Sequence, residues 1–164
     1  MKNLPDKQQV WAWLRDVRDP EVPVLSILDL GIVRDVQITD AGAAIIFITP
    51  TYSGCPAMDV IGVNIRMALA GRGFSEVRIE LQLSPAWTTD WMSIEGKQKL
   101  KEYGIAPPAR MTGNSPGLFE DDSISCPRCD STNTRLVSNY GATACKAMYQ
   151  CNSCHEPFEH FKCH

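Results

Sequence analysis

Hydrophobic and polar positions alternate with two different periods in the N-terminal part of the chain. Across residues 8–17 the apolar side chains follow the i, i+3, i+4, i+7 spacing of an amphipathic helix, and Asp6 is placed to cap its start. Residues 32–39 alternate with a period of two, and the turn at residues 40–42 leads into the most apolar run, residues 43–48. The pattern predicts a helix and then a β-hairpin with a buried second strand.

The same change of period occurs again further along. Residues 56–72 have the spacing of a helix that ends at Gly73, and residues 77–83 alternate as a strand whose apolar side chains are expected to point inward. Because a helix joins the two strands, this strand is expected to lie parallel to residues 43–48 in a right-handed crossover. A short helix is predicted over residues 96–103. The fold class is therefore α+β or α/β, a small mixed sheet packed with helices in the order α-β-β-α-β-α.

The composition changes after residue 104. Residues 105–125 are rich in proline, glycine, serine and acidic residues, which is typical of a linker. Of the seven cysteines, six lie after residue 125. The predicted organisation is an α/β domain at residues 1–104, a linker at residues 105–125 and a small cysteine module at residues 126–164.

Charge and hydropathy exclude several classes of protein. The 164 residues are 44% hydrophobic and 21% charged, as in an ordinary soluble globular protein. A net charge of −3 gives no support for nucleic-acid binding, and no apolar run approaches the ~18 residues of a membrane span. The first residues also lack the apolar segment of a secretory signal. We therefore expect a cytoplasmic protein with no nucleic-acid or membrane partner.

Four cysteines form two C-x-x-C pairs, Cys126 with Cys129 and Cys151 with Cys154. Each pair can present two sulfur atoms to the same tetrahedral ion. In a reducing compartment, and with an odd total of cysteines, this pattern favours a metal site over disulfide bonds. The four residues are therefore the predicted metal ligands.

One zinc ion per chain is the predicted occupant, because structural four-cysteine ribbons usually bind zinc. Mononuclear iron or an iron–sulfur cluster would also accept four thiolates, so iron stays an alternative. Residues 132–138 and 146–150 are predicted to be the two strands of the ribbon. Cys145, Cys163 and His164 are further donors nearby, interpreted as surface or packing residues, with the last two as a weak adventitious metal site.

The segment from Thr49 to Pro56 joins the apolar run to the helix that follows. Gly54 allows a sharp turn, and Pro56 suits the first position of a helix. Cys55 is thus expected at or beside the helix N-cap, where the helix dipole favours a thiolate. A small buried core cysteine is the alternative, and spacing alone does not choose between them.

Three segments together resemble the small α/β domain of SufT-like and cytosolic iron–sulfur assembly proteins. They are Asp19-Pro20-Glu21, the sequence LDLGIV at residues 28–33 and the sequence TPTYSGCP at residues 49–56. The resemblance covers about residues 6–103. Together with the cysteine module and the sequence SPAWTTDWM at residues 84–92, it extends to the branch of this family associated with the phenylacetyl-CoA epoxidase system of aerobic phenylacetate breakdown.

This resemblance implies a non-catalytic maturation factor. Cys55 would be the functional thiol that transiently holds iron or an iron–sulfur cluster, with Asp19, Glu21 and Thr51 near it. The implied partners are the reductase and oxygenase subunits of the epoxidase, and a homodimer is a further expectation. In agreement with this, the chain has no Glu-x-x-His pair of a di-iron site and no G-x-G-x-x-G dinucleotide fingerprint.

Other interpretations stay open at this point. A structural or coupling subunit would act only through its surfaces and would have an inert Cys55. A direct electron carrier would hold iron at the four module cysteines. From the residues alone, the Asp19–Glu21 segment is interpreted as a solvated turn, and Trp87 and Trp91 as caps of the sheet.

Overall fold

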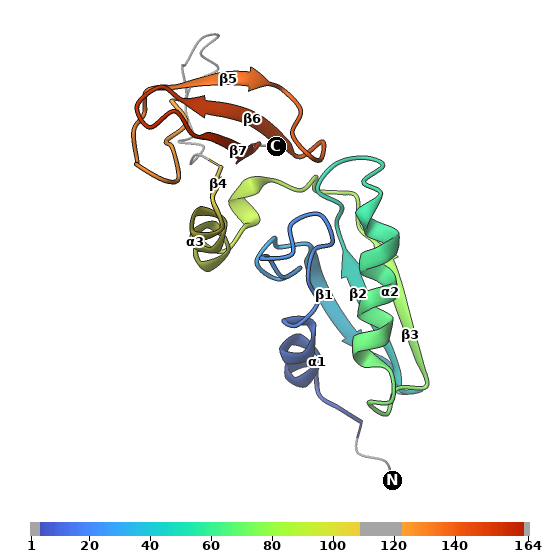
Figure 1. Cartoon of the computed structure of the whole chain (residues 1–164). Coiled ribbons are helices and arrows are strands. Elements are labelled where there is room, and N and C mark those ends of the chain that lie inside the picture. Colours follow the sequence, from blue (N-terminus) through green and yellow to red (C-terminus); the bar gives the residue numbers. More distant parts are fainter. Residues whose placement is uncertain (1–3, 109–122, 163–164) are drawn as a thin grey trace. The chain divides into compact units, whose positions relative to one another are not determined.

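The computed structural model describes residues 4–108 and 123–162, which fold into two compact units (Figure 1). One unit extends to Gly96 and the other begins at Lys97. The division therefore falls within helix α3 (Ile94–Tyr103). No helix in the described part of the chain is long and apolar enough to cross a membrane.

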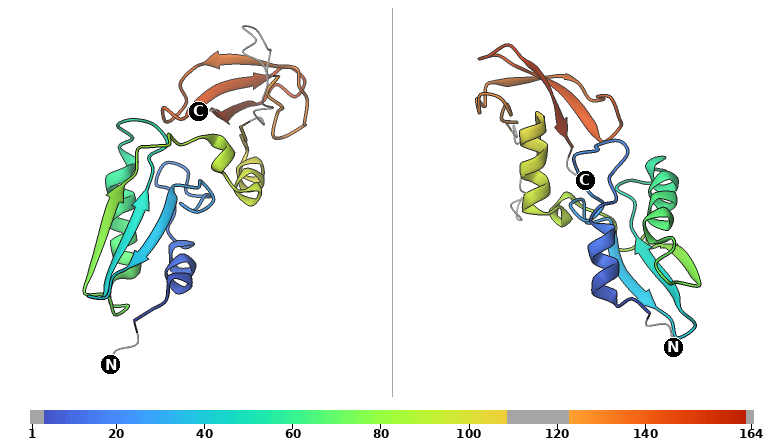
Figure 2. Two further views of the ribbon diagram at one scale, coloured as in Figure 1. Left: turned by 180° about the vertical axis from the view of Figure 1, so that it is seen from behind. Right: turned by 60° about the horizontal axis from the view of Figure 1, so that its bottom comes forward.

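The first unit is a three-stranded mixed sheet with two helices. Strand β1 (Val33–Ile38) pairs antiparallel with β2 (Ala43–Ile48), and β2 pairs parallel with β3 (Glu76–Leu81). Helix α1 (Lys7–Leu14) contacts β1, and helix α2 (Ala57–Leu69) contacts both α1 and β3 (Figures 1 and 2). The predicted hairpin and the predicted parallel third strand are both confirmed.

The core of this unit lies on one face of the sheet. Ala44, Ile46 and Ile48 of β2 are fully buried, whereas Ile45 and Phe47 on the opposite face are only half-buried. The alternation follows from the pleat of the strand, which turns successive side chains to opposite faces. The two helices therefore cover the face that carries the even-numbered residues of β2.

Both helices are shorter than predicted. The carboxylate of Asp6 accepts a hydrogen bond from the N–H three residues on (2.8 Å), so the predicted cap of α1 is confirmed. This helix ends at Leu14, and the N–H of Val17 bonds back to the carbonyl of Leu14 (3.2 Å) in a tighter turn. Helix α2 ends at Leu69 instead of residue 72, because the chain becomes extended and Gly71 takes a positive φ of 72°.

The predicted inward orientation of the apolar side chains of the third strand is only partly right. Val77 and Ile79 are half-buried, but Leu81 is 60% exposed and Leu83 is 67% exposed. Leu81 is the last residue of the edge strand β3 and Leu83 lies beyond its end. The two leucines therefore leave apolar surface in contact with water.

The second unit contains α3 from Lys97 onward and a four-stranded sheet. The order is β4 (Ile105–Ala106), β7 (Pro157–Phe161), β6 (Lys146–Cys151) and β5 (Thr134–Ser138). The two predicted ribbon strands correspond to β5 and β6, which pair antiparallel. Strands β4 and β7 were not predicted, and β4 falls within the range assigned to a linker. Residues 109–122 of that range lie outside the described residues.

A small core holds the second unit together. Its buried members include two of the module cysteines and come from β4, β6, β7 and the loop before β5: Ala106, Ile124, Cys126, Cys151 and Phe158. The ring of Tyr149 stacks on that of Phe158, with 5.8 Å between their centroids. The sulfur atoms are thus part of the apolar core as well as candidate ligands.

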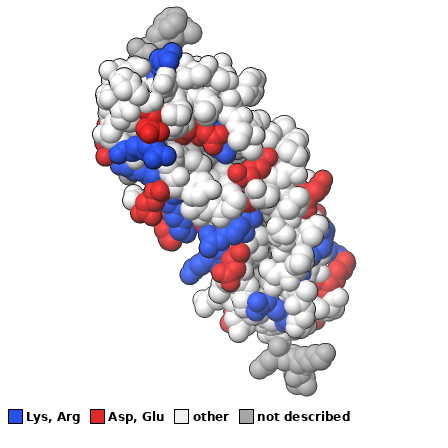
Figure 3. All heavy atoms as spheres, in the orientation of Figure 1, with Lys and Arg blue, Asp and Glu red and all other residues white. Residues whose placement is uncertain are grey.

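Acidic and basic side chains are intermingled on the face shown in Figure 3. This mixture accords with the small net charge of −3. Neither sign of charge forms a continuous patch among the described residues of that face.

Candidate functional site

Cys55 lies in the turn between β2 and α2, directly before Pro56, the N-cap residue of α2. Its N–H bonds to the carbonyl of Tyr52 (3.2 Å), and its own carbonyl accepts a bond from the N–H of Met58 (3.3 Å). Gly54 takes a positive φ of 76°, which a residue with a side chain rarely adopts. The side chain of Cys55 is partly accessible rather than buried in the core.

The hydroxyl of Thr51 lies 4.0 Å from the sulfur of Cys55, within hydrogen-bonding range for sulfur. The same turn also forms one wall of a pocket of about 170 Å³. Thr51, Tyr52 and Ser53 line this pocket on the side of the turn, and Leu83, Ala86 and Trp87 line the other side. Thr51 therefore belongs both to the surroundings of the Cys55 sulfur and to the pocket.

The wall formed by Trp87 is held in place by residues of the LDLGIV segment. The indole N–H of Trp87, which is buried, donates a hydrogen bond to the carbonyl of Leu30 (2.7 Å). Gly31 has a φ of 69°, and a Cβ atom there would lie 2.4 Å from the carbonyl oxygen of Trp91. The guanidinium of Arg34 lies over the ring of Trp91, 3.6 Å from its centroid. The two tryptophans thus pack against the LDLGIV segment and the neighbouring Arg34.

Asp29, in the LDLGIV segment, also contacts the residues that follow Trp91. Its buried carboxylate accepts hydrogen bonds from the N–H of Ser26 (2.9 Å) and from the hydroxyl of Ser93 (3.1 Å). Ser93 follows the short 3₁₀ helix η1 (Thr89–Trp91). A Cβ atom on Gly96 would lie 2.9 Å from the Cβ of Asp29, so the start of α3 passes very close to Asp29.

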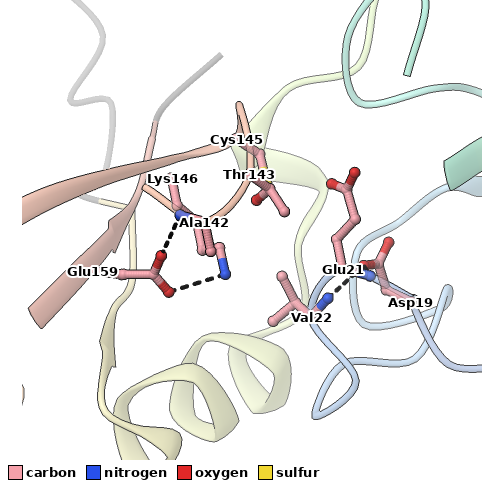
Figure 4. Close-up of polar contacts among 8 residues, drawn as sticks. All are labelled: Asp19, Glu21, Val22, Ala142, Thr143, Cys145, Lys146 and Glu159. Carbon is pink, nitrogen blue, oxygen red and sulfur yellow. Dashed lines mark hydrogen bonds and ion pairs between the residues drawn. The ribbon is translucent and has the colours of Figure 1, made fainter. Parts of the chain in front are cut away.

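The interpretation of the Asp19–Glu21 segment as a solvated turn is wrong for Asp19. Its side chain is buried, and its carboxylate accepts hydrogen bonds from the N–H groups of Glu21 (2.8 Å) and Val22 (2.7 Å) (Figure 4). The carboxylate therefore closes the turn by satisfying two backbone donors. The association of Asp19 and Glu21 with the function of Cys55 stays a prediction, whereas Thr51 makes the contact given above.

The four cysteines of the two C-x-x-C pairs come together in the second unit. The sulfur atoms of Cys126 and Cys154 are 3.8 Å apart, and those of Cys129 and Cys151 are 3.6 Å apart. All four sulfur atoms lie within 4.8 Å of one another. A tetrahedral ion with bonds of ~2.3 Å to sulfur separates its ligands by ~3.8 Å, whereas a disulfide bond is ~2.05 Å long. The donor set therefore fits one tetrahedral thiolate-binding ion.

Hydrogen bonds shift the pKa values of these thiols in opposite directions. The N–H of Cys154 donates to the sulfur of Cys151 (3.4 Å), and this bond, with a second from Ser153, lowers the pKa of Cys151 to about 6. The N–H of Ser131 favours the thiolate of Cys129, but desolvation and the neighbouring thiols outweigh it and raise the pKa of Cys129 to about 12. A metal ion that binds at neutral pH therefore finds Cys151 largely as a thiolate and must displace the proton of Cys129.

Two further donors in the described part of this unit, Cys145 and His160, have packing roles, whereas His155 is exposed. Cys145 is buried with its sulfur 3.0 Å from the hydroxyl of Thr143, and a ring nitrogen of His160, also buried, lies 3.2 Å from a backbone carbonyl. Lys146 forms a buried ion pair with Glu159 (3.0 Å), whose carboxylate also accepts a bond from the N–H of the loop before β6 (Figure 4). The predicted adventitious site at residues 163–164 lies outside the described residues.

Comparison with known proteins agrees with this architecture. Residues 7–83 match the family described as iron–sulfur cluster assembly protein, and residues 112–162 match the PaaD zinc beta ribbon domain. A solved domain of unknown function from Bacillus anthracis is 29% identical with a TM-score of 0.54, covering 57% of this chain and 90% of that one. A conserved hypothetical protein from Thermotoga maritima is 32% identical with a TM-score of 0.52, covering 61% and 98%.

Fold and sequence together define an iron–sulfur-assembly domain that carries a four-cysteine ribbon. An Fe–S protein maturation auxiliary factor of Porphyromonas gingivalis (strain ATCC BAA-308 / W83) is 35% identical over 98 residues, 59% of this chain and 92% of that protein. A protein of Escherichia coli (strain K12), provisionally named as a 1,2-phenylacetyl-CoA epoxidase subunit, is 50% identical over 159 residues, 97% of this chain and 94% of that protein. The chain belongs to the family of this epoxidase subunit, the PaaD family.

Proposed function

We propose that the chain is a cytoplasmic, non-catalytic maturation factor of the phenylacetyl-CoA epoxidase system. It passes iron or an iron–sulfur cluster to the reductase or the oxygenase subunit through the thiol of Cys55. The observation that carries this proposal is the position of Cys55, which is partly accessible, directly precedes the N-cap of α2 and has the Thr51 hydroxyl beside its sulfur. The N-terminus of a helix favours an anionic group such as a cluster-bound thiolate.

The relatives support the two halves of this proposal separately. The assembly domain resembles proteins named as Fe–S maturation auxiliary factors, which supports handling of iron or clusters. The full length of the chain resembles a protein named as an epoxidase subunit, which supports the choice of client. A maturation factor that serves this oxygenase system is the function that agrees with both similarities.

The cargo needs more ligands than Cys55 provides. Iron–sulfur clusters are commonly held by four thiolates, so one thiol cannot complete the shell. The missing donors would come from thiols of the client or from Cys55 of a second copy in a homodimer. Transfer then follows when the client's own cysteines replace these ligands, with the cargo as substrate rather than resident cofactor.

We assign the four-cysteine centre a structural zinc ion, held by Cys126, Cys129, Cys151 and Cys154. Zinc would supply folding energy to the ribbon, because a module of this size has only a small apolar core. The ribbon would then serve to dock the client. In this proposal the assembly domain, residues 1–104, binds and transfers the iron or cluster, and residues 126–164 recognise the client.

A strain that carries Cys55→Ser tests the proposal. The substitution keeps the shape of the side chain and removes the thiolate, and Met67→Ala, an exposed change further along α2 and outside the pocket lining, is the control. We expect the epoxidase reductase or oxygenase from the Cys55→Ser strain to lack most of its iron, while the control strain gives full occupancy. Normal iron and sulfide contents in both clients of the Cys55→Ser strain would refute it.

A coupling subunit is the second candidate, favoured by the extent of the likeness to a protein named as a subunit, 94% of whose length is matched. It predicts stoichiometric co-purification with the oxygenase and no effect of Cys55→Ser on client iron. The same strain therefore separates the two functions.

A further inference from the structure

The pocket beside the Cys55 turn is small and has no charged side chain in its lining. Its volume of about 170 Å³ is below the ~300–1,000 Å³ of sites for drug-sized ligands and nucleotides. Anionic thiols of low molecular weight carry carboxylates, which need cationic or N–H partners when they leave water. The lining offers hydroxyl groups and apolar surface instead, which suits one uncharged side chain.

The pocket and the sulfur of Cys55 share Thr51 as a neighbour. Thr51 lines the pocket, and its hydroxyl lies 4.0 Å from that sulfur. A polypeptide advances ~3.3 Å per residue when extended. A client cysteine that shares a cargo with Cys55 would therefore bring the side chain one or two residues away to the mouth of this pocket.

The opposite wall is both preformed and partly apolar. Trp87 is fixed by its hydrogen bond to the carbonyl of Leu30 (2.7 Å), so the wall does not have to form when a ligand binds. Leu83 lies on the same wall and is 67% exposed. Covering this leucine with another apolar side chain would remove apolar surface from water.

We infer that the pocket between the Cys55 turn and Trp87 binds one apolar side chain of the client polypeptide, next to the client cysteine that takes the cargo. This inference rests on the proposed function, since it gives the pocket a role in transfer from Cys55. It assigns the assembly domain a share in client recognition, separate from docking by the ribbon.

Thiol–disulfide exchange on the full chain, with its ribbon metal in place, tests the inference. The probes are acetyl-Leu-Gly-Cys-Gly-Leu-amide and its serine analogue acetyl-Ser-Gly-Cys-Gly-Ser-amide, each with its cysteine in a disulfide to thionitrobenzoate. The Cys55 thiolate attacks the peptide sulfur, the bond between the two Cys sulfurs forms, and coloured thionitrobenzoate leaves as an anion. Buffer takes the Cys55 proton, absorbance gives the rate, and mass spectrometry of the Cys55-containing fragment confirms the site.

Two leucines on the same edge provide a matched pair of variants. Leu83 lines the pocket, whereas Leu81, two residues earlier and 60% exposed, does not. We expect the wild type to react about tenfold faster with the leucine peptide than with the serine peptide. Leu83→Ser should reduce this preference by about threefold or more, and Leu81→Ser should leave it unchanged.

Three results would overturn the inference: equal rates with both peptides, an equal loss of preference in the two leucine variants, or faster exchange with the mixed disulfide of glutathione and thionitrobenzoate than with the leucine peptide. These rates are measured without any client. If the wild type prefers the leucine peptide but the clients of the Cys55→Ser strain contain normal iron, only the proposed function is refuted. If those clients lack iron but the wild type shows no leucine preference, only the proposed role of the pocket is refuted.

Discussion

The indole N–H of Trp87 donates a hydrogen bond of 2.7 Å to the carbonyl oxygen of Leu30. These residues are far apart in the chain, and their bond joins two of the segments on which the family resemblance rests. It also fixes the wall of the pocket beside the Cys55 turn. The LDLGIV segment therefore supports the site by holding Trp87 in position. Its side chains need not take part in the reaction for the segment to be functionally important.

Gly31→Ala should destabilise the first unit strongly. Gly31 has a φ of 69°, and a Cβ atom there would lie 2.4 Å from the carbonyl oxygen of Trp91. Backbone strain and overpacking together should lower the free energy of unfolding by about 2–5 kcal/mol. Urea unfolding followed by tryptophan fluorescence measures this, because all four tryptophans lie before residue 97.

Gly71→Ala is the control for that experiment. Gly71 has a φ of 72°, nearly the same as Gly31, but nothing lies within 4 Å of its Cβ position. Only the strain of the positive φ remains, so the free energy of unfolding should fall by about 1–2 kcal/mol. Equal losses in the two variants would contradict the close packing of Gly31 against Trp91.

Features set by local periodicity and chain connection were predictable from the sequence. The hairpin and the parallel third strand are examples, because alternation marks a strand and an intervening helix dictates a crossover. Alternation failed at β1, where the register shifts between Val33 and Asp35. Both Ile32 and Val33 are buried as a result, and only pairing with β2 decides where such a bulge lies.

Features set by tertiary partners were missed. Strand β4 has two residues and exists because Ile105 and Ala106 pair with β7, so no local pattern could mark it. The burial of Asp19 was missed as well, although an Asp before Pro at the start of a turn is a recognised signal for side-chain bonding to backbone N–H groups. The pocket depends on Trp87 and Leu30, whose approach no local rule predicts.

Cys151→Ser should release the metal and unfold the ribbon. Cys151 is fully buried among the four sulfur atoms, and three thiolates cannot complete the tetrahedral shell. Cys145→Ser is the matched control, since Cys145 is also buried in this unit but outside the group. Metal analysis and circular dichroism should show loss of the ion in the first variant and one ion per chain in the second. Full occupancy in Cys151→Ser would contradict the ligand set.

Metal affinity should fall as the pH falls. The pKa of Cys151 is lowered to about 6, so it is a thiolate at pH 7, while the raised pKa values of Cys129 and Cys154 keep those thiols protonated. A metal ion must therefore displace at least these two protons at pH 7, and one more from Cys151 below pH 6. Competition with a chromophoric chelator between pH 5 and 8 measures this. An affinity independent of pH would contradict it.

In the proposed function, Cys55 carries iron or an iron–sulfur cluster on its way to the client. The most direct test is the content of iron, sulfide and zinc, together with the absorption spectrum, of the full chain purified without air. We predict about one ribbon zinc per chain in both wild type and Cys55→Ser, and iron with a visible chromophore in the wild type alone. Identical spectra and iron contents in the two proteins would contradict this role of Cys55.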